Sequence, residues 1–307
     1  MSRRGLLLFA AMSVIWGIPY LFIRIAVHEI SPATLVAIRT GVAALILLPI
    51  AFRRGDLRGI GKAWPWIVVF AVVEVGGPWF ALSSAEQQIS SSLAGLLISA
   101  VPLVTLVIGI AFRNRQQIGP LNLGGLLVGL VGVALIVGFD LRASNVVALI
   151  EMAVVVVGYS LGPTIFARYL AGVPSFAVNG IALALCCIAY APIAAVQWPH
   201  AVPSPGVFGA LAVLAIVCTA LAFILFFELV KEVGPVRASV ITYINPAVAA
   251  VLGVAVLRES LTVGMLLGFG LVLAGSGLAT RLPGALPEGR MIRVPDDPGR
   301  VGEGAPR

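Results

Sequence analysis

The feature that most constrains the fold of this chain is a succession of long apolar runs. Ten such runs, separated by short charged or Gly/Pro-rich breaks, occupy most of the 307 residues. An α-helix needs about 20 residues to cross the roughly 30 Å hydrocarbon core of a bilayer. We therefore expect ten transmembrane helices, at approximately 5–27, 32–51, 64–84, 90–112, 121–138, 146–169, 175–197, 205–230, 235–257 and 262–280.

The composition agrees with a membrane protein and excludes other classes. Apolar residues make up 60% of the chain and charged residues 11%, with a mean hydropathy of +1.08, whereas a soluble domain carries about 25% charged residues. Soluble enzymes, disordered regulators and secreted disulfide scaffolds are thereby excluded. The runs are continuously apolar rather than alternating, as at 6–11, which favours helices over the strands of a membrane β-barrel. The expected fold class is an all-α integral membrane protein.

The three cysteines lie inside apolar runs and give neither a disulfide framework nor a zinc site; they are Cys186, Cys187 and Cys218. We expect no cofactor, no metal and no catalytic residue.

The distribution of positive charge predicts the orientation in the membrane. The net charge of +7 could suggest nucleic acid, but Lys and Arg concentrate in alternate loops, such as Arg53 and Arg113. The other loops keep only the basic residues Arg142 and Arg258, together with acids such as Glu86. Short cytoplasmic loops of membrane proteins carry this excess. We expect a multi-pass protein of the bacterial inner membrane with both termini cytoplasmic, a lipid bilayer as its surroundings and no nucleic acid as a partner.

The sequence also predicts the structure of the two ends of the chain. The first apolar run follows Arg3 and Arg4 like a signal peptide, but it continues through Trp16 and Pro19 without a small-residue cleavage site, so we interpret it as a retained helix. The segment 282–307 is rich in Pro and Gly with mixed charge, which predicts a disordered cytoplasmic tail.

The chain repeats itself at an offset of 144 residues. This offset pairs prolines and arginines as well as apolar residues; the pairs include Pro19 with Pro163, Arg24 with Arg168, Pro102 with Pro246, and Gly124 with Gly268. Each half holds five runs, so the halves, 1–140 and 141–281, would enter the membrane from opposite sides. Inverted repeats of this kind are typical of secondary transporters, whose binding sites lie near the midplane where the repeats meet.

The motifs of both halves resemble a known family. The stretch Ile15-Trp16-Gly17-Ile18-Pro19-Tyr20-Leu21-Phe22-Ile23-Arg24 is followed by Ser31-Pro32 and Arg39. The second half carries Glu228 to Gly234, Asn245-Pro246, Leu257-Arg258-Glu259 and Gly268 to Gly275. In this order the motifs resemble the EamA-type transporters of the drug/metabolite transporter superfamily. The resemblance implies a basket of helices 1, 3, 4, 6, 8 and 9 around a central cavity, with helices 5 and 10 at the edge. It also implies export of a small polar metabolite such as an amino acid.

Glu74 is the sharpest single candidate for a functional residue. It falls near the middle of the third run, where a carboxylate facing lipid would cost at least about 2.5 kcal/mol. It could carry a proton or pair with a substrate ammonium, or it could make a structural hydrogen bond to a neighbouring helix. Its counterpart in the second half is Cys218, so the role would belong to one half only.

Further candidates for substrate contact lie on the helices expected around the cavity. They are aromatic or polar and comprise Trp16, Tyr20, Trp79, Ser99, Tyr159, Tyr243 and Asn245. Pro102 and Pro246 each remove a helical hydrogen bond, and the freed carbonyls could serve a polar ligand. Arg39 is interpreted as a structural anchor.

Two glycine patterns have competing interpretations. G-x-x-x-G at 125–129 and 264–268 indicates close helix packing within one chain or between two copies, which leaves a homodimer open. Gly158-Tyr159-Ser160-Leu161-Gly162 fits the nucleophile elbow of serine hydrolases, but both histidines, His28 and His200, fall in loops on the opposite side from Ser160. The favoured function is therefore a gradient-driven transporter. An intramembrane hydrolase using Ser160 or Glu74, and a non-transporting structural subunit, are the alternatives.

Overall fold

The structure, a computed structural model, describes residues 1–58, 60–111, 120–138 and 143–279. Within these ranges it contains helices and no strand. The predicted tail at 282–307 and the loop arginines Arg113, Arg115 and Arg142 lie outside the described residues. The elements in chain order are α1 (Arg3–Ile15), α2 (Pro19–Ala26), α3 (Pro32–Arg53), η1 (Ile60–Lys62), α4 (Trp64–Phe70), η2 (Ala71–Gly76), α5 (Gly77–Ala85), α6 (Ser91–Ile98), α7 (Val101–Ala111), α8 (Pro120–Val137), α9 (Ala143–Tyr169), α10 (Ser175–Val196), α11 (Pro205–Ala212), η3 (Val213–Leu221), α12 (Ala222–Val233), α13 (Pro235–Ala238), α14 (Ile241–Leu257) and α15 (Val263–Ala279).

Eight helical stretches are long and apolar enough to cross a membrane. They are Arg3–Ala26, Pro32–Arg53, Trp64–Ala85, Ser91–Gly109, Pro120–Val137, Val146–Tyr169, Ser175–Val196 and Pro205–Val233. Two further apolar helices, α14 and α15, have 17 residues each, or about 26 Å at 1.5 Å per residue. The all-helical membrane class is confirmed, and each of the eight stretches coincides with a predicted run to within a few residues.

Serine and proline fix where several helices begin. The Ser31 hydroxyl accepts a hydrogen bond from the Thr34 amide at 3.2 Å, and Pro32 follows at the first helical position of α3. The Ser90 hydroxyl accepts one from the Leu93 amide at 3.1 Å at the start of α6. These side chains satisfy amides that have no partner within the helix.

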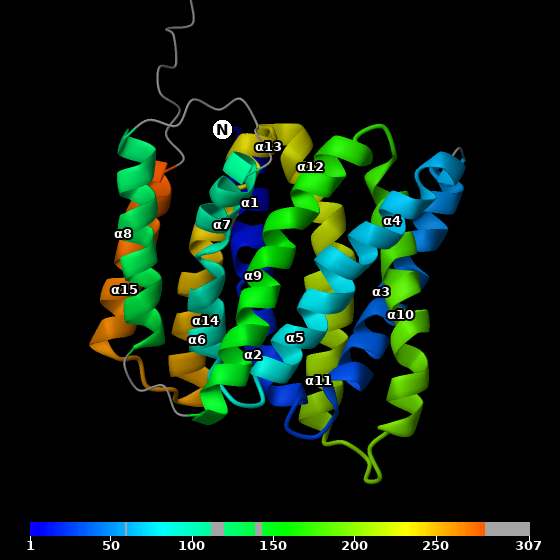
Figure 1. Cartoon of the computed structure of the whole chain (residues 1–307). Helices are drawn as coiled ribbons and strands as arrows, with labels where there is room; N and C mark the ends of the chain where they lie inside the picture. Colours follow the sequence, from blue (N-terminus) through cyan, green and yellow to red (C-terminus); the bar gives the residue numbers. More distant parts are fainter. Residues whose placement is uncertain (59, 112–119, 139–142, 280–307) are drawn as a thin grey trace, which may run out of the picture.

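Helix pairs from the two halves of the chain lie at the edges of the molecule. Figure 1 shows α8 beside α15 at one edge and α3 beside α10 at the other. The edge position of α8 and α15 agrees with the implication of the family resemblance for helices 5 and 10. Between the edges lie two large buried apolar clusters, one around α2, α5 and α6 and the other around α3, η2 and α10. Tyr159 of α9 packs against both clusters.

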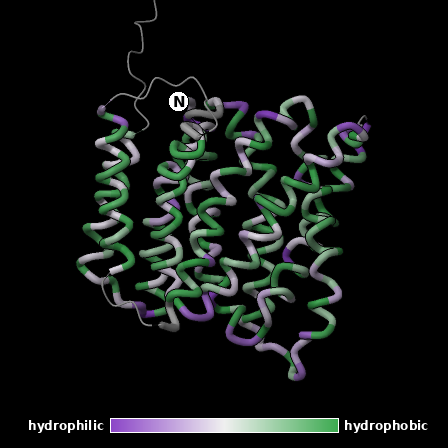
Figure 2. The backbone as a smooth tube through the Cα atoms, in the orientation of Figure 1, coloured by the Kyte–Doolittle hydropathy of each residue, from purple (hydrophilic) through white to green (hydrophobic). Residues whose placement is uncertain are grey.

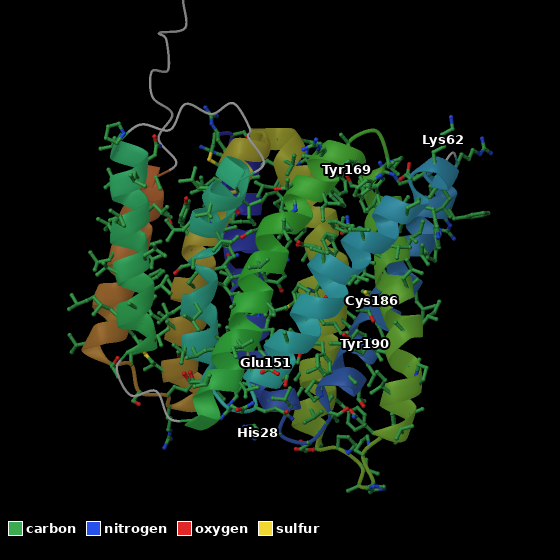
Figure 3. All side chains as sticks on the ribbon, viewed as in Figure 1. His28, Lys62, Glu151, Tyr169, Cys186 and Tyr190 are labelled. Atoms are coloured by element: carbon green, nitrogen blue, oxygen red, sulfur yellow. The ribbon has the colours of Figure 1, made fainter. Side chains whose placement is uncertain are left out.

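Residues in the middle of the helices are mostly hydrophobic, and hydrophilic residues are more frequent at the helix ends and in the turns (Figure 2). Leu45, Leu7 and Val251 are 76%, 71% and 64% exposed, which in water would be unfavourable but suits a lipid environment. Figure 3 places Lys62 and Tyr169 at one end of the bundle and His28 at the opposite end. We name these ends the Lys62 face and the His28 face.

Candidate functional site

Two π-helical segments interrupt the third and eighth predicted spans. They are η2, which carries Glu74, and η3, which carries Thr219. A shift of 144 residues moves η2 to 215–220, inside η3, so the same backbone irregularity occurs at matching positions of the two halves. Short π-helical segments are rare and occur frequently at functional sites.

Side chains of α10 satisfy carbonyl groups of the first π-helix. The Tyr190 hydroxyl donates to the Gly76 carbonyl at 3.0 Å, and the Cys186 thiol donates to the Ala71 carbonyl at 3.3 Å. Figure 3 shows these two side chains near each other on α10. Cys186 is therefore a weak donor to the π-helix as well as a packing residue.

Glu74 lies against two glycines of α9. A Cβ atom at Gly162 would overlap the Glu74 carboxyl group, and one at Gly158 would meet the Val73 carbonyl and Pro78. Glu74 makes no hydrogen bond or ion pair with the described residues, and its Oε2 atom is enclosed without a donor. A carboxylate in such a place is stable only when it is protonated or when a partner binds it.

These contacts give the G-x-S-x-G pattern a packing role. Gly158 and Gly162 are four residues apart on one face of α9 and let it approach η2 and α5. The Ser160 hydroxyl donates to the backbone carbonyls of Val156 at 2.7 Å and Val101 at 3.1 Å. No imidazole contacts it, since His28 lies in the turn after α2 at the far end of the bundle, so the elements of a serine nucleophile are not assembled.

Arg39 is the charged centre of the buried region. It is 5% exposed and lies in α3, seven residues or about 10 Å from Pro32. Its Nε atom donates to the Thr219 hydroxyl at 2.9 Å. Its guanidinium carbon lies 3.7 Å from the centroid of the Trp79 ring, a cation–π geometry worth about 2 kcal/mol when desolvated.

Two tyrosines and an acid complete this cluster. Tyr20, Tyr159 and Glu86 are close enough to Arg39 to interact with it electrostatically, and Trp79 also approaches the Tyr159 hydroxyl. The cluster therefore joins α2, α3 and α5 of the first half to α9 and η3 of the second half. We call these six residues, Tyr20, Arg39, Trp79, Glu86, Tyr159 and Thr219, the Arg39 cluster.

Glu86 is a buried acid without hydrogen-bonding partners for its carboxyl group. It follows the last residue of α5, it is 0% exposed, and neither carboxyl oxygen has a donor among the described residues. Arg24 donates instead to the backbone carbonyl of Glu86. Burial raises the pKa of the Glu86 carboxyl group well above its ordinary value, and the nearby Arg24 offsets only part of this effect.

The structure divides the residues predicted to contact substrate into two groups. Tyr20, Trp79 and Tyr159 meet in the Arg39 cluster, and Glu74 lies close enough to Tyr159 to interact with it. The others lie elsewhere. Trp16 packs on Phe223 and Phe226, and the Ser99 hydroxyl donates to the Leu96 carbonyl. The Asn245 amide, in its flipped orientation, donates to the Ser13 and Ile241 carbonyls, and Tyr243 lies on α14.

Sequence reasoning missed three members of the Arg39 cluster. Arg39 was interpreted as an anchor, Glu86 was assigned to a loop, and Thr219 was not considered. The free-energy cost of a charge inside a membrane could have identified Arg39 as a functional candidate. The side-chain contacts of Thr219 and Glu86 leave no periodic pattern in the sequence. Among the described residues no group of His, Cys, Asp and Glu could hold a metal ion.

The long apolar helices, which enclose a cluster of charged and aromatic residues, define this chain as a multi-pass membrane protein. It belongs to the EamA-like transporter family, whose sequence profile matches residues 3–138 and again residues 147–281. The resemblance inferred from the motifs is thus confirmed, and the chain is a transporter and not an enzyme.

Relatives and a solved structure agree with this assignment. The "Uncharacterized inner membrane transporter YedA" of Escherichia coli (strain K12) is 25% identical over 280 residues, which cover 88% of each chain. An "Uncharacterized transporter" of Archaeoglobus fulgidus is 23% identical over 270 residues, covering 87% of this chain and 95% of the relative. A solved structure described as "Crystal structure of protein" is 23% identical, covers 91% of this chain and 97% of its own, and has a TM-score of 0.64, which shows a shared fold.

Proposed function

We propose that this protein is a secondary active transporter that exports a small polar metabolite, such as an amino acid or a related compound, by alternating access. The observation that carries the proposal is the Arg39 cluster, because it combines charge, hydroxyl groups and aromatic rings between helices of both halves. Charged and polar side chains are costly inside a membrane and mark the pathways of polar solutes and ions, which such groups contact on their way through the membrane.

The transport mechanism follows from a repeat architecture of ten spanning helices in two inverted halves. Its support is the 144-residue offset in the sequence and the matching positions of η2 and η3. Rocking of one half against the other would expose the cluster first to one side and then to the other. The Lys62 face is the proposed cytoplasmic side, since it carries Lys62, Arg53 and Lys231, and Figure 1 shows the N-terminus and the described end of α15 on that side.

Glu74 is the proposed proton carrier. Its enclosed Oε2 atom has no donor, so a proton, or a substrate ammonium in its place, would stabilise the carboxyl group. Proton movement down its gradient would then drive the conformational cycle.

The experiment uses proteoliposomes that contain trapped pyranine and face an equimolar mixture of the twenty common L-amino acids. We expect the wild-type protein to move protons when the mixture is added and Glu74→Gln to abolish this movement. Glu228→Gln is the matched control, since Glu228 pairs with Arg4 and Lys231 at the Lys62 face. Unchanged proton movement in a folded Glu74→Gln protein would refute the role of Glu74.

The structural-subunit alternative has a separate test. A non-transporting subunit would co-purify with another polypeptide in fixed stoichiometry and would move no solute.

A homodimer is not needed to explain the G-x-x-x-G patterns. Gly125, Gly268 and Gly275 pack α8 against α15 of the same chain, and Gly129 packs α8 against α7.

A further inference from the structure

Arg39 is a buried positive charge without a negative partner. One of its donors, Nε, is committed to Thr219, and one face of its guanidinium group rests on Trp79. Among the described residues no carboxylate lies within ion-pair distance, and no acceptor bonds the two Nη groups. These Nη groups are not among the enclosed side-chain atoms that lack partners, so they are not sealed by packed protein.

Glu86 does not serve as the missing partner. It lies close enough to Arg39 for an electrostatic interaction, yet both of its carboxyl oxygens remain without a hydrogen bond. Because burial also raises the pKa of the Glu86 carboxyl group, Glu86 does not neutralise the charge of Arg39. An unpaired charge in a medium of low dielectric constant is strongly unfavourable, and Thr219 and Trp79 compensate for it only in part.

Building on the proposed transport function, we propose that Arg39, held by Thr219 and Trp79, is the subsite that binds a carboxylate group of the transported compound. With Nε occupied, the two Nη groups remain to form the charge-assisted hydrogen bonds that a planar carboxylate accepts. A single guanidinium group matches a monoanion better than a doubly charged phosphate. Tyr20 and Tyr159 add aromatic surface and hydroxyl groups beside it.

The position of the subsite suits this role. The holding groups come from both halves of the chain, since Trp79 belongs to α5 and Thr219 to η3. Movement of one half against the other would therefore change the contacts that hold the guanidinium group. Two surface hollows, one beside Trp198 and one beside His200, do not border Arg39, so neither competes as the carboxylate site.

The first test compares the metabolites secreted by cells that produce the wild-type protein, Arg39→Gln or Arg168→Gln. Arg168 is exposed at the end of α9 and is the matched control. We expect the compounds whose secretion depends on the wild-type protein to carry a carboxylate. Arg39→Gln should lower their secretion at least tenfold at equal amounts of folded protein, and Arg168→Gln should leave it unchanged.

The second test separates binding from a structural role. Each secreted acid is compared with its own primary amide as a substrate in proteoliposomes. The wild-type protein should prefer the acid at least tenfold, and Arg39→Gln should lose this preference. A merely structural arginine would lower both rates and keep the preference. If Arg39→Gln does not fold, Thr219→Val, which keeps the positive charge, should raise the KM for the acid several-fold and leave that for the amide unchanged.

The outcomes distinguish the subsite from the proposed function. Protein-dependent secretion of compounds without a carboxylate, or an acid preference that survives in Arg39→Gln, would overturn the subsite and leave the transport function standing. If no compound depends on the protein for its secretion, the transport function itself is overturned, and the subsite with it.

Discussion

Glu86 illustrates how a residue at the end of a helix differs from a loop residue. A hydropathy boundary at 84 predicts that Glu86 lies in water, yet the structure buries it, close enough to Tyr20 and Tyr159 to interact with them. The side chain of a residue that ends a helix can still point into the bundle, because the direction of a helical side chain depends on its angle around the axis.

The raised pKa of Glu86 predicts a specific dependence of stability on pH. The folded protein favours the neutral carboxyl group, so this contribution to stability is fully present below the ordinary glutamate pKa of about 4.3. It is lost as the pH rises through the raised pKa of the folded state. We expect the melting temperature in detergent to fall with rising pH in this window, and to fall less in Glu86→Gln. Equal slopes for the two proteins would contradict the burial of a titrating Glu86.

The contact between Gly162 and Glu74 predicts a second effect of a single residue. Gly162→Ala places a methyl group where the Glu74 carboxyl group lies, so we expect a loss of about 1–3 kcal/mol in unfolding free energy and slower transport. Combining it with Glu74→Ala should recover part of the stability, because the smaller side chain leaves room. Additive losses in the double variant, measured by thermal unfolding, would show that the two residues do not interact.

The sequence singles out both Glu74 and Arg39 as charges inside predicted spans, and it predicts a functional carboxylate for the first and a structural anchor for the second. The two side chains differ in the partners that the folded bundle gives them. Glu74 is left without a donor, as a lone acid in an apolar run suggests, while Arg39 is held by Thr219 and Trp79 from distant parts of the chain. Contacts between distant segments have no trace in hydropathy, so the sequence predicted Tyr20, Trp79 and Tyr159 as candidates but could not assign Thr219 and Glu86 to the cluster.

At the scale of elements, the glycine face between α8 and α15 replaces ordinary side-chain packing. A Cβ atom at Gly275 would overlap the backbone of Gly129, and one at Gly132 would meet the backbone of α15. Such close approach permits dispersion contacts that lipid cannot replace. The G-x-x-x-G patterns predicted close packing, and the structure identifies the partner as the corresponding helix of the other half.

Two glycines on α15 allow a matched test of this face. Gly275→Ala should destabilise the protein by about 1–3 kcal/mol, since backbone atoms cannot yield to the added methyl group. Gly277→Ala should be neutral or slightly stabilising, because nothing lies within 4 Å of its Cβ position and alanine favours helix by about 1 kcal/mol. Unfolding in detergent by heat measures both, and equal effects would contradict the close packing.

A second element-scale feature joins the two halves at the His28 face. The Glu259 carboxylate accepts hydrogen bonds from the amides of Ser91 and Ser92 at 2.8 and 2.9 Å, at the start of α6. Burial raises the pKa of Glu259, but the bonds from Ser92 and Ser91 outweigh it and hold the pKa below its ordinary value. Glu29 makes a similar contact with the Ser204 amide before α11.

These contacts predict local changes in hydrogen exchange. Glu259→Ala should speed the exchange of the Ser91 and Ser92 amides at least tenfold, because charge-assisted bonds of about 1.5–3 kcal/mol are lost. Glu29→Ala should speed exchange at Ser204 and leave Ser91 unchanged. If Glu259→Ala left the α6 amides as protected as before, Glu259 would not hold the two halves together.

The π-helices mark the limit of sequence reasoning about elements. The positions of the helices followed from hydropathy. The change from α-helical to π-helical hydrogen bonding at η2 and η3 did not; at η2 the carbonyls are bonded by Cys186 and Tyr190 of α10, a distant part of the chain.

At the scale of the whole molecule, the sequence predicted which segments cross the membrane more completely than it predicted the residues of any single site. Apolar runs and their lengths determine which segments cross the membrane, and the structure places eight of the ten predicted runs in helices of sufficient length. The ninth run is shorter than predicted, since α14 begins only after a break at 239–240, and in the tenth run the described part of α15 is Val263–Ala279.

As a whole, the molecule is proposed to carry a small polar solute across the membrane using a gradient. The most direct test loads proteoliposomes with a cell metabolite extract, imposes a pH gradient, and measures by mass spectrometry what leaves. We predict that a small set of polar metabolites leaves faster from liposomes with the protein than from protein-free liposomes, and that collapse of the gradient slows their release. Equal release from both kinds of liposome, with folded and inserted protein, would contradict the account.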